Sequence, residues 1–213
     1  MTDQLEQRLT KLHGIGAAKA RDLVAAGVKS PADLRKPKYF NMLDVDAQIH
    51  LKYRVTKEVP RGMATRLINR LPHYLIPVGS YRRRSKAISD LDLLTTLPIC
   101  RLIEDLERLA DNFKFIFVYM CGAERASMII SFAGKNIHVD VFHTAKEDLP
   151  YALFHWTGNK NFNIRTRAHA KRQGYKLNQY GLFRGDKKIK VNDERELFDI
   201  LGVTYKEPWQ RSE

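Results

Sequence analysis

The chain has 213 residues, 44% of them hydrophobic, which is enough for one compact domain or for two or three small subdomains. Its 37 lysines and arginines against 24 acidic residues give a formal net charge of +13, which indicates a polyanionic partner such as nucleic acid. The sequence has no run of about 18 apolar residues and no signal-peptide pattern, so we expect neither a membrane span nor a membrane partner. Two cysteines, Cys100 and Cys121, without metal-site spacing or a disulfide pattern favour a reducing, intracellular compartment, either nucleus or cytoplasm.

Residues 1–60 are predicted to be helical. Three leucines share one face of a first helix: Leu5, Leu9 and Leu12. Gly14 and Gly16 interrupt this pattern, a second helix is expected over residues 17–26, and Ser30 is expected to cap a third. Helix, Gly-x-Gly turn and helix form the helix-hairpin-helix pattern, whose turn presents backbone N–H groups to a phosphate without reading a base.

Residues 61–144 and 145–213 are predicted to form two further parts. In the first, helices are expected over residues 63–71 and 99–110, and strands over residues 74–78, 91–97, 113–120, 128–132 and 136–142. In the second, a helix rich in Arg and Lys is expected over residues 161–173, before a strand pair between residues 176 and 191. These patterns alone predict an α+β fold.

Three acidic residues carry the strongest chemical signal. Asp90 and Asp92 are two apart in a predicted strand and therefore point to the same face, and Asp140 stands in another strand-like run about fifty residues later. Carboxylate oxygens of this kind suit Mg²⁺, which takes the rest of its shell from water and substrate phosphates. Two such ions about 3.5–4 Å apart can hold the attacking and leaving oxygens of a phosphoryl transfer.

A phosphate-binding segment precedes the first two acids. Gly79-Ser80 is predicted to form a tight turn through which backbone N–H groups approach a phosphate. Four cations follow this turn: Arg82, Arg83, Arg84 and Lys86. The arginine fork is well shaped to grip phosphate oxygens. A Gly-Ser turn or an Asp-x-Asp alone is weak evidence, but together, at this spacing, they predict nucleotidyl transfer.

Later motifs make the pattern recognisable. They are His155 to Gly158, Asn163 with Arg167 to Ala170, Leu177 to Leu182, and the tail from Glu196 to Pro208. With Gly79-Ser80, Arg83 and the Asp-x-Asp pair, they resemble the family X DNA polymerases, the group of DNA polymerase β, from about residue 8 to the C-terminus. The later stretches are especially similar to the small viral members of that family, which lack the N-terminal helical segment present here.

The resemblance implies a function for each part of the chain. It implies a DNA-binding helix-hairpin-helix subdomain at residues 1–60, a catalytic palm with a mixed β-sheet at 61–144, and a nucleotide-selecting α/β subdomain at 145–213. It also implies that Asp90 and Asp92 bind two Mg²⁺ ions, for which Mn²⁺ can substitute. Asp140 is then expected to bind only the catalytic ion and to accept the proton of, or orient, the primer 3′-hydroxyl.

The resemblance also implies the contacts to nucleotide and DNA. The incoming nucleotide is expected to be held by Arg61, Gly79, Ser80, Arg83, Ser89, His155, Trp156, Gly158 and Asn163. The implied DNA contacts are Gly14, Gly16, Lys19 and Arg167, and the carbonyls of Thr10, Leu12 and Ile15 are implied to hold Na⁺ or K⁺. The two rings of His155 and Trp156 are expected to exclude a 2′-hydroxyl; the alternative for both is packing.

Four positions depart from the family pattern. Ser89 replaces a glycine, Lys160 an acid near the base, Gln179 a glutamate, and His138 an arginine beside the acids. These changes affect the expected fidelity and closure, not the reaction. Because the sequence starts almost at the hairpin, we expect no counterpart of the N-terminal lyase domain of polymerase β, and the small size suggests by analogy a virus or microbe.

These observations predict a monomeric polymerase that adds deoxynucleoside triphosphates to primers in gapped or primed duplex DNA. Short-gap filling in base excision repair without lyase activity, with a DNA ligase as functional partner, is the expected role. One alternative is a template-independent nucleotidyltransferase of the same superfamily. The other is a DNA-binding module with an inactive site, against which the presence of all three acids argues.

Overall fold

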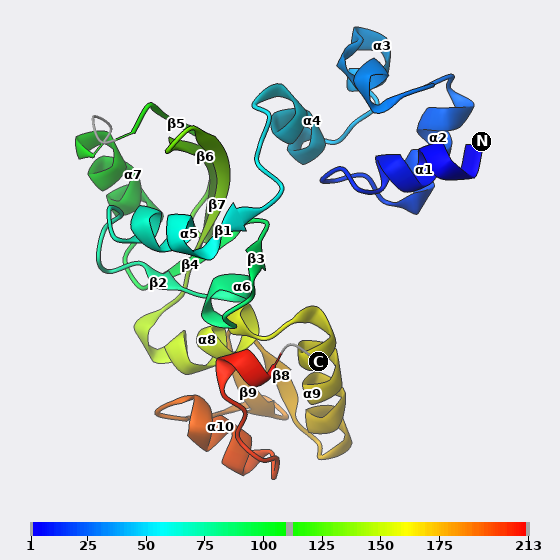
Figure 1. Ribbon diagram of the computed structural model, residues 1–213. Helices are drawn as coiled ribbons and strands as arrows, with labels where there is room; N and C mark the ends of the chain where they lie inside the picture. The colour runs from blue at the N-terminus through cyan, green and yellow to red at the C-terminus, as the bar shows by residue number, and fades with distance from the viewer. Residues whose placement is uncertain (1, 110–112, 212–213) are drawn as a thin grey trace. The chain divides into compact units, whose positions relative to one another are not determined.

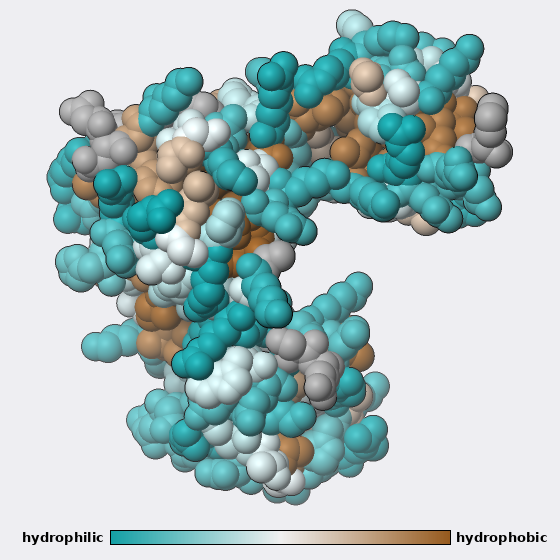
Figure 2. All heavy atoms as spheres, in the orientation of Figure 1, coloured by the Kyte–Doolittle hydropathy of each residue, from teal (hydrophilic) through white to brown (hydrophobic). Residues whose placement is uncertain are grey.

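The computed structural model describes residues 2–109 and 113–211 and divides the chain into two compact units, Met1–Lys57 and Glu58–Glu213 (Figure 1). The three-part division into residues 1–60, 61–144 and 145–213 stays a prediction. On the face shown in Figure 2, hydrophilic residues cover much of each unit, and hydrophobic residues are exposed at scattered places among them. None of the described helices is long and apolar enough to cross a membrane.

The smaller unit consists of short helices around a leucine-rich core. They are α1 (Thr2–Leu9), α2 (Ala17–Ala25), the 3-10 helix η1 (Pro31–Arg35), α3 (Pro37–Phe40) and α4 (Val45–Lys52). Leu9, Leu23 and Leu34 are fully buried in this core. The third helix begins at Ser30 as predicted, but it is a short 3-10 helix, and the Asp33 carboxylate accepts the Ser30 N–H at 2.8 Å.

The larger unit contains a five-stranded mixed sheet in the order β2-β4-β7-β6-β5. Its strands are β2 (Ile76–Pro77), β4 (Leu91–Thr95), β5 (Phe115–Cys121), β6 (Arg125–Phe132) and β7 (Lys135–His143). Strands β4 and β7 run parallel, whereas the other neighbours are antiparallel. A separate two-stranded pair joins β1 (Val59–Pro60) to β3 (Ala87–Ile88).

Alternation along the strands separates the two faces of this sheet. Ile137, Val139 and Val141 of β7 point into a core that also holds buried residues of α5 (Arg61–Ile68) and α7 (Ile99–Arg108). These two helices therefore cover the same face. The intervening residues of β7, among them Asp140, point to the opposite face. The α+β class and the mixed sheet expected from the sequence are confirmed.

Several predicted boundaries differ from the structure. The strand expected over residues 74–78 is reduced to Ile76–Pro77, and α5 lies two to three residues earlier than predicted. Strand β6 begins at Arg125 instead of residue 128, because its first residues are charged or small and hide the apolar alternation. The predicted helix over 99–110 is α7, and Ala110 lies outside the described residues.

The C-terminal segment of this unit has its own aromatic core. It contains the 3-10 helix η3 (Lys146–Asp148), α8 (Leu149–Thr157), α9 (Lys160–Arg172), α10 (Glu194–Ile200) and the 3-10 helix η4 (Pro208–Gln210). A three-stranded antiparallel sheet contains β8 (Lys176–Asn178), β9 (Gly181–Arg184) and β10 (Lys187–Ile189). Phe154 of α8 packs in this core, whereas Ala152 of the same helix packs against Leu94 and Phe142 of the large sheet. Helix α8 thus joins the two sheets.

Candidate active site

The three predicted catalytic acids converge on the large sheet, on the face opposite α5 and α7. Asp92 of β4 and Asp140 of β7 are direct Cα partners in the parallel strand pair, which sets their side chains next to each other. Asp90 directly precedes β4, and alternation gives it the same side as Asp92. Separate parts of the sequence therefore supply one anionic cluster.

The electrostatics of the cluster differ from one acid to the next. Burial, followed by the negative charges of Asp90 and Asp140, raises the pKa of Asp92 to about 7. Burial alone would also raise the pKa of Asp140, but contacts with His138, Ser127 and Arg125 lower it to about 2. Asp140 is therefore held ionised by its neighbours, whereas the negative charge on Asp92 has little compensation.

These acids fit divalent metal ions. In the described part of the chain no group donates a hydrogen bond to the carboxylate of Asp90 or Asp92, so their oxygens are available as hard ligands. A dication between them and Asp140 would also relieve the repulsion that raises the Asp92 pKa. The donor set is the one the sequence predicted for Mg²⁺.

The Gly79-Ser80 segment lies directly against this cluster. It is not the predicted tight turn: both residues belong to α6 (Gly79–Arg82), a single helical turn after Val78. Gly79 has a φ of +54°, and a Cβ on it would lie 2.0 Å from Asp92 Oδ2, so only glycine fits here. Among the described residues the buried Ser80 hydroxyl has no hydrogen-bond partner, as is expected of a group that binds a phosphate oxygen of a ligand.

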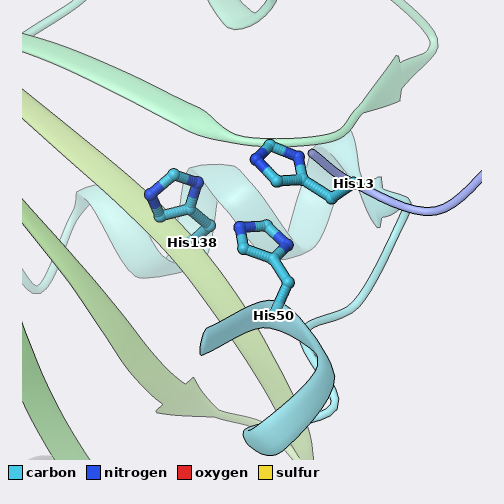
Figure 3. Close-up of side chains that lie close together, drawn as sticks. All are labelled: His13, His50 and His138. Carbon is cyan, nitrogen blue, oxygen red and sulfur yellow. The ribbon is translucent and has the colours of Figure 1, made fainter. Parts of the chain in front are cut away.

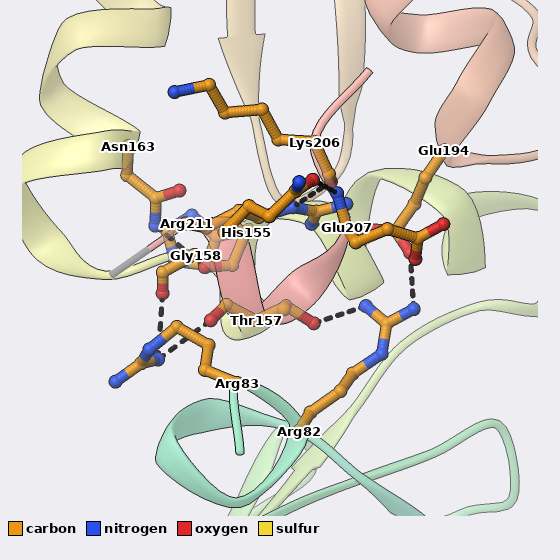
Figure 4. A network of polar contacts seen from close by, with 11 residues as sticks. Arg82, Arg83, His155, Thr157, Gly158, Asn163, Glu194, Lys206, Glu207 and Arg211 are labelled. Atoms are coloured by element: carbon orange, nitrogen blue, oxygen red, sulfur yellow. Dashed lines mark hydrogen bonds and ion pairs between the residues drawn. The ribbon is translucent and has the colours of Figure 1, made fainter. Parts of the chain in front are cut away.

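Two arginines after this segment connect it to α8 (Figure 4). The Arg83 guanidinium donates to the carbonyl oxygens of Thr157, at 2.7 Å, and Gly158, at 3.0 Å. Arg82 donates to the Thr157 hydroxyl and to Glu194 Oε2, the latter at 2.5 Å. The Gly79–Arg83 segment and the end of α8 are therefore held in one network of polar contacts.

A pocket of about 480 Å³ opens beside these groups. With Asp92, seven of the residues predicted to contact nucleotide or DNA line it: Gly79, Arg83, His155, Trp156, Gly158, Asn163 and Arg167. They come from α6 and the residue after it, β4, the end of α8 with Gly158, and the first eight residues of α9. The fold thus gathers into one concave surface residues that span almost ninety positions of the sequence.

The wall of the pocket opposite the acids is made by α8 and α9. His155 and Trp156 lie in the last turn of α8, and the Arg167 guanidinium donates to His155 Nδ1 at 2.5 Å. Burial and the charge of Arg167 lower the pKa of His155 to about 4. Trp156 stacks on Phe142 with ring centroids 3.6 Å apart, so it both packs against the sheet and lines the pocket.

Asn163 fits closely against the residues that precede α9. Its Nδ2 donates to the His155 carbonyl at 2.7 Å, and its buried Oδ1 has no hydrogen-bond partner in the part of the chain that the structure describes. A Cβ on Gly158 would lie 2.3 Å from that oxygen, so the glycine lets Asn163 approach. An unpaired buried acceptor at the pocket wall suits a donor on a bound ligand.

Comparisons with known proteins agree with this geometry. The DNA polymerase beta thumb family matches residues 152–212. The repair DNA polymerase X of African swine fever virus (isolate Pig/Kenya/KEN-50/1950) is 38% identical over 148 residues, which cover 68% of this chain and 85% of that protein. The chain belongs to the family X DNA polymerases. It is therefore a DNA-directed DNA polymerase, of a family that acts in DNA repair and uses divalent metal ions.

Two more distant family X proteins extend the likeness over the whole chain. DNA polymerase lambda of Arabidopsis thaliana is 24% identical over 241 residues, which cover 93% of this chain and 45% of that protein. Polymerase beta of Leishmania infantum, in the crystal structure of a ternary P/T complex, superposes with a TM-score of 0.82 at 23% identity. That likeness covers 100% of this chain and 99% of the other, and it shows the shared fold.

Three predicted nucleotide contacts of this family X polymerase are not among the residues that line the pocket: Arg61, Ser80 and Ser89. Arg61 instead donates to the Tyr81 carbonyl at 2.7 Å and lies over the Tyr81 ring, 4.3 Å from its centroid. It therefore braces the segment that carries Ser80. Ser89 is exposed between β3 and β4. Of the family departures, Lys160 lines the pocket, where it adds positive charge.

The predicted hairpin of the polymerase lies between α1 and α2 of the smaller unit. Gly14 has a φ of +72°, and a Cβ on it would meet Ala47, so glycine is required there, whereas Gly16 faces open space. The Leu12 carbonyl accepts the Ile15 N–H at 3.3 Å, and the Thr10 hydroxyl donates to the Gln7 carbonyl.

Two further contacts lie beside this hairpin. Lys19 donates to the Met42 carbonyl at 3.1 Å, so it is held within the unit rather than extended. His13 stacks on His50 of α4 with ring centroids 3.6 Å apart (Figure 3), which ties the turn to that helix.

Sequence reasoning missed two residues of the acid cluster. Arg125 and Ser127 of β6 both contact the Asp140 carboxylate, Arg125 at 2.8 Å and Ser127 at 2.5 Å. They alternate on the strand that pairs with β7, so a prediction of β6 with its correct register would have found them. The predicted start at residue 128 excluded both. His138 lies 3.4 Å from Asp140 Oδ1 and 2.7 Å from the Tyr119 hydroxyl.

Proposed function

We propose that this family X polymerase fills short gaps in DNA by two-metal nucleotidyl transfer. The observation that carries the proposal is the direct pairing of Asp92 with Asp140, beside a pocket that also exposes Gly79 and Arg83. Asp90 and Asp92 would hold two Mg²⁺ ions, or Mn²⁺ in their place, and Asp140 one of them. When bound, the ions supply charge for both the attacking and the leaving oxygen.

The acids have different roles toward the primer. The Asp140 carboxylate, with its pKa lowered to about 2, is a weak base and a strong anionic ligand. Orientation of the primer 3′-hydroxyl therefore suits Asp140 better than lasting acceptance of its proton. Asp92, with its pKa raised to about 7, is the better proton acceptor of the two in the metal-free protein.

Different residues in and around the pocket would bind different parts of the nucleotide. The Ser80 hydroxyl and the Arg83 guanidinium are assigned to the triphosphate. Arg83 lines the pocket with Asp92, and Ser80 directly follows Gly79, which lies against Asp92. The buried Ser80 hydroxyl has no hydrogen-bond partner among the described residues. His155, Trp156 and Gly158 are assigned to the sugar. The unpaired Oδ1 of Asn163 and the Arg167 guanidinium are assigned to the base and the template.

The smaller unit would hold the DNA backbone. Gly14 and Gly16 are proposed to present N–H groups to a phosphate, with Lys19 nearby. A monovalent cation on the carbonyls of Thr10, Leu12 and Ile15 would neutralise the repulsion between those oxygens and the phosphate. The net charge of +13 supports a nucleic-acid partner of this kind.

The cellular role is proposed as base excision repair inside the cell, by a monomer. None of the described lysines is buried, so none of them has the desolvation that activates a Schiff-base lysine in an apolar pocket. The enzyme would therefore fill a gap but would not remove an abasic sugar from the DNA end, and a DNA ligase would seal the product.

Primer extension on gapped, nicked and single-stranded DNA tests the proposal, with each deoxynucleotide offered separately. Gap filling that follows the template supports it. Terminal addition to single strands would favour a template-independent enzyme. Asp140→Ala is expected to abolish incorporation while DNA binding stays within about twofold, because it removes a metal ligand and no proposed DNA contact. Activity of this variant within tenfold of the parent would refute the assignment of the acids.

A further inference from the structure

Arg125 covers the carboxylate of Asp140 from the neighbouring strand. Antiparallel pairing sets Ser127 opposite Asp140 and Arg125 opposite Phe142, so all four side chains are on the same face of the sheet. Arg125 Nη2 donates to both carboxylate oxygens, at 2.9 Å to Oδ1 and 2.8 Å to Oδ2, and Nε lies 3.3 Å from Oδ1. One guanidinium therefore engages both oxygens of a proposed metal ligand.

The two oxygens of Asp140 are not equivalent. Oδ1 also accepts the Ser127 hydroxyl at 2.5 Å and lies 3.4 Å from His138 Nε2. In the described part of the chain, Oδ2 is bonded by Arg125 alone. Oδ2 is therefore the oxygen that an ion can reach by displacing a single donor, and that donor is Arg125.

The Arg125 guanidinium can leave the Asp140 carboxylate without becoming a buried, unpaired charge. Its side chain is 37% exposed, against 8% for Asp140, so the guanidinium can hydrate. Its central carbon also lies 5.5 Å from the centroid of the Phe142 ring, whose face attracts a cation. Because a guanidinium cannot lose its proton in a protein, its charge always opposes a dication at the same carboxylate.

We propose that Arg125 is an internal counter-cation that occupies Asp140 in the metal-free enzyme and is displaced by the divalent ion. Arg125 thereby sets the ion concentration at which the site fills, and its guanidinium holds the Asp140 carboxylate in place until then. It is a positioning residue that acts through Asp140. This inference rests on the proposed function of Asp140 as a metal ligand.

Manganese titration of the full chain without DNA tests the inference, with free Mn²⁺ measured by electron paramagnetic resonance. In Arg125→Gln the half-saturating Mn²⁺ concentration should fall about tenfold, because the competing charge-assisted hydrogen bonds are gone. Arg125→Lys keeps the positive charge but loses the two-pronged guanidinium. Its half-saturating Mn²⁺ concentration should lie between those of the parent and of Arg125→Gln. Arg101→Gln, an exposed arginine of α7 that pairs with Asp105, is the matched control and should leave binding unchanged.

A double-mutant cycle separates this inference from the proposed function. In an Asp140→Asn background, Arg125→Gln should no longer change Mn²⁺ binding, since the contact is already lost. A persistent effect in that background would overturn the inference, as would Arg125→Gln with unchanged or weaker binding in the parent. If Asp140→Asn alone leaves Mn²⁺ binding unchanged, Asp140 is no metal ligand and the proposed function fails first. Circular dichroism of each variant reports whether it is folded.

Discussion

Glu194→Gln should destabilise the larger unit strongly, because Glu194 is the only anion between two arginines in the described network (Figure 4). Glu194 Oε1 accepts from Arg211 at 2.6 Å and Oε2 from Arg82 at 2.5 Å. Arg211 is fully buried, and Glu194 is 7% exposed. The substitution keeps the shape of the side chain and removes its charge.

The magnitude follows from the burial of Arg211. A buried arginine cannot shed its proton, so its charge remains without an anion, and breaking such a pair costs about 3–5 kcal/mol. Arg211 keeps part of its stabilisation because four aromatic rings surround its guanidinium with centroids at 5.1–5.8 Å. Arg82 is 24% exposed and can hydrate. We therefore expect a loss of about 3 kcal/mol in the free energy of unfolding.

Urea unfolding followed by tryptophan fluorescence measures this loss. Both tryptophans, Trp156 and Trp209, belong to the larger unit, so their emission reports that unit alone. Glu104→Gln is the matched control: its pair with Arg101 is exposed, with a separation of 3.7 Å, and should contribute at most about 0.5 kcal/mol.

A double variant refines the test. Adding Arg211→Met to Glu194→Gln should cost less than the sum of the two single changes, because it removes the unpaired buried charge. A loss below about 1 kcal/mol in Glu194→Gln would show that the network is not the buried ion pair that these contacts describe.

Three further predictions concern the pocket and its chemistry. Gly79→Ala should lower the polymerisation rate at least tenfold and the free energy of unfolding by about 1–2 kcal/mol, because its Cβ would lie 2.0 Å from Asp92 Oδ2 and its φ is +54°. Single-turnover kinetics and urea unfolding measure the two effects. Gly62→Ala, with open space around it, should be neutral in both assays. Burial and the charge of Arg167 lower the pKa of His155 from 6.5 to about 4. Between these pH values the folded state therefore binds fewer protons than the unfolded state, so the free energy of unfolding should fall as the pH falls from 6.5 to 4. After discounting for solvent screening this contribution is about 1–2 kcal/mol, and an equally steep fall in His155→Gln would contradict it. Borohydride trapping on an incised abasic substrate should give no covalent adduct, and an adduct lost on mutation of one lysine would reveal a second active site.

Local sequence determined the parts of the site that depend on neighbours along the chain. The spacing of Asp90 and Asp92 required only the two-residue period of a strand, and Gly79-Ser80 lay close enough in sequence to be read with them. The helix and strand patterns by themselves predicted the α+β class, and the signature was specific enough to indicate the family. The predicted turn at Gly79 was wrong in form, because one helical turn and a tight turn have similar signals over four residues.

The tertiary structure alone decided which distant side chains meet. Asp92 faces Asp140 because β4 and β7 pair in one parallel register, and a shift of one residue would turn Asp140 to the other face. Arg125 and Ser127 reach Asp140 only through the antiparallel register of β6. Arg211 reaches Glu194 through the packing of the C-terminal tail. Such contacts depend on strand register and on packing between elements, which the spacing of residues along a single chain does not contain.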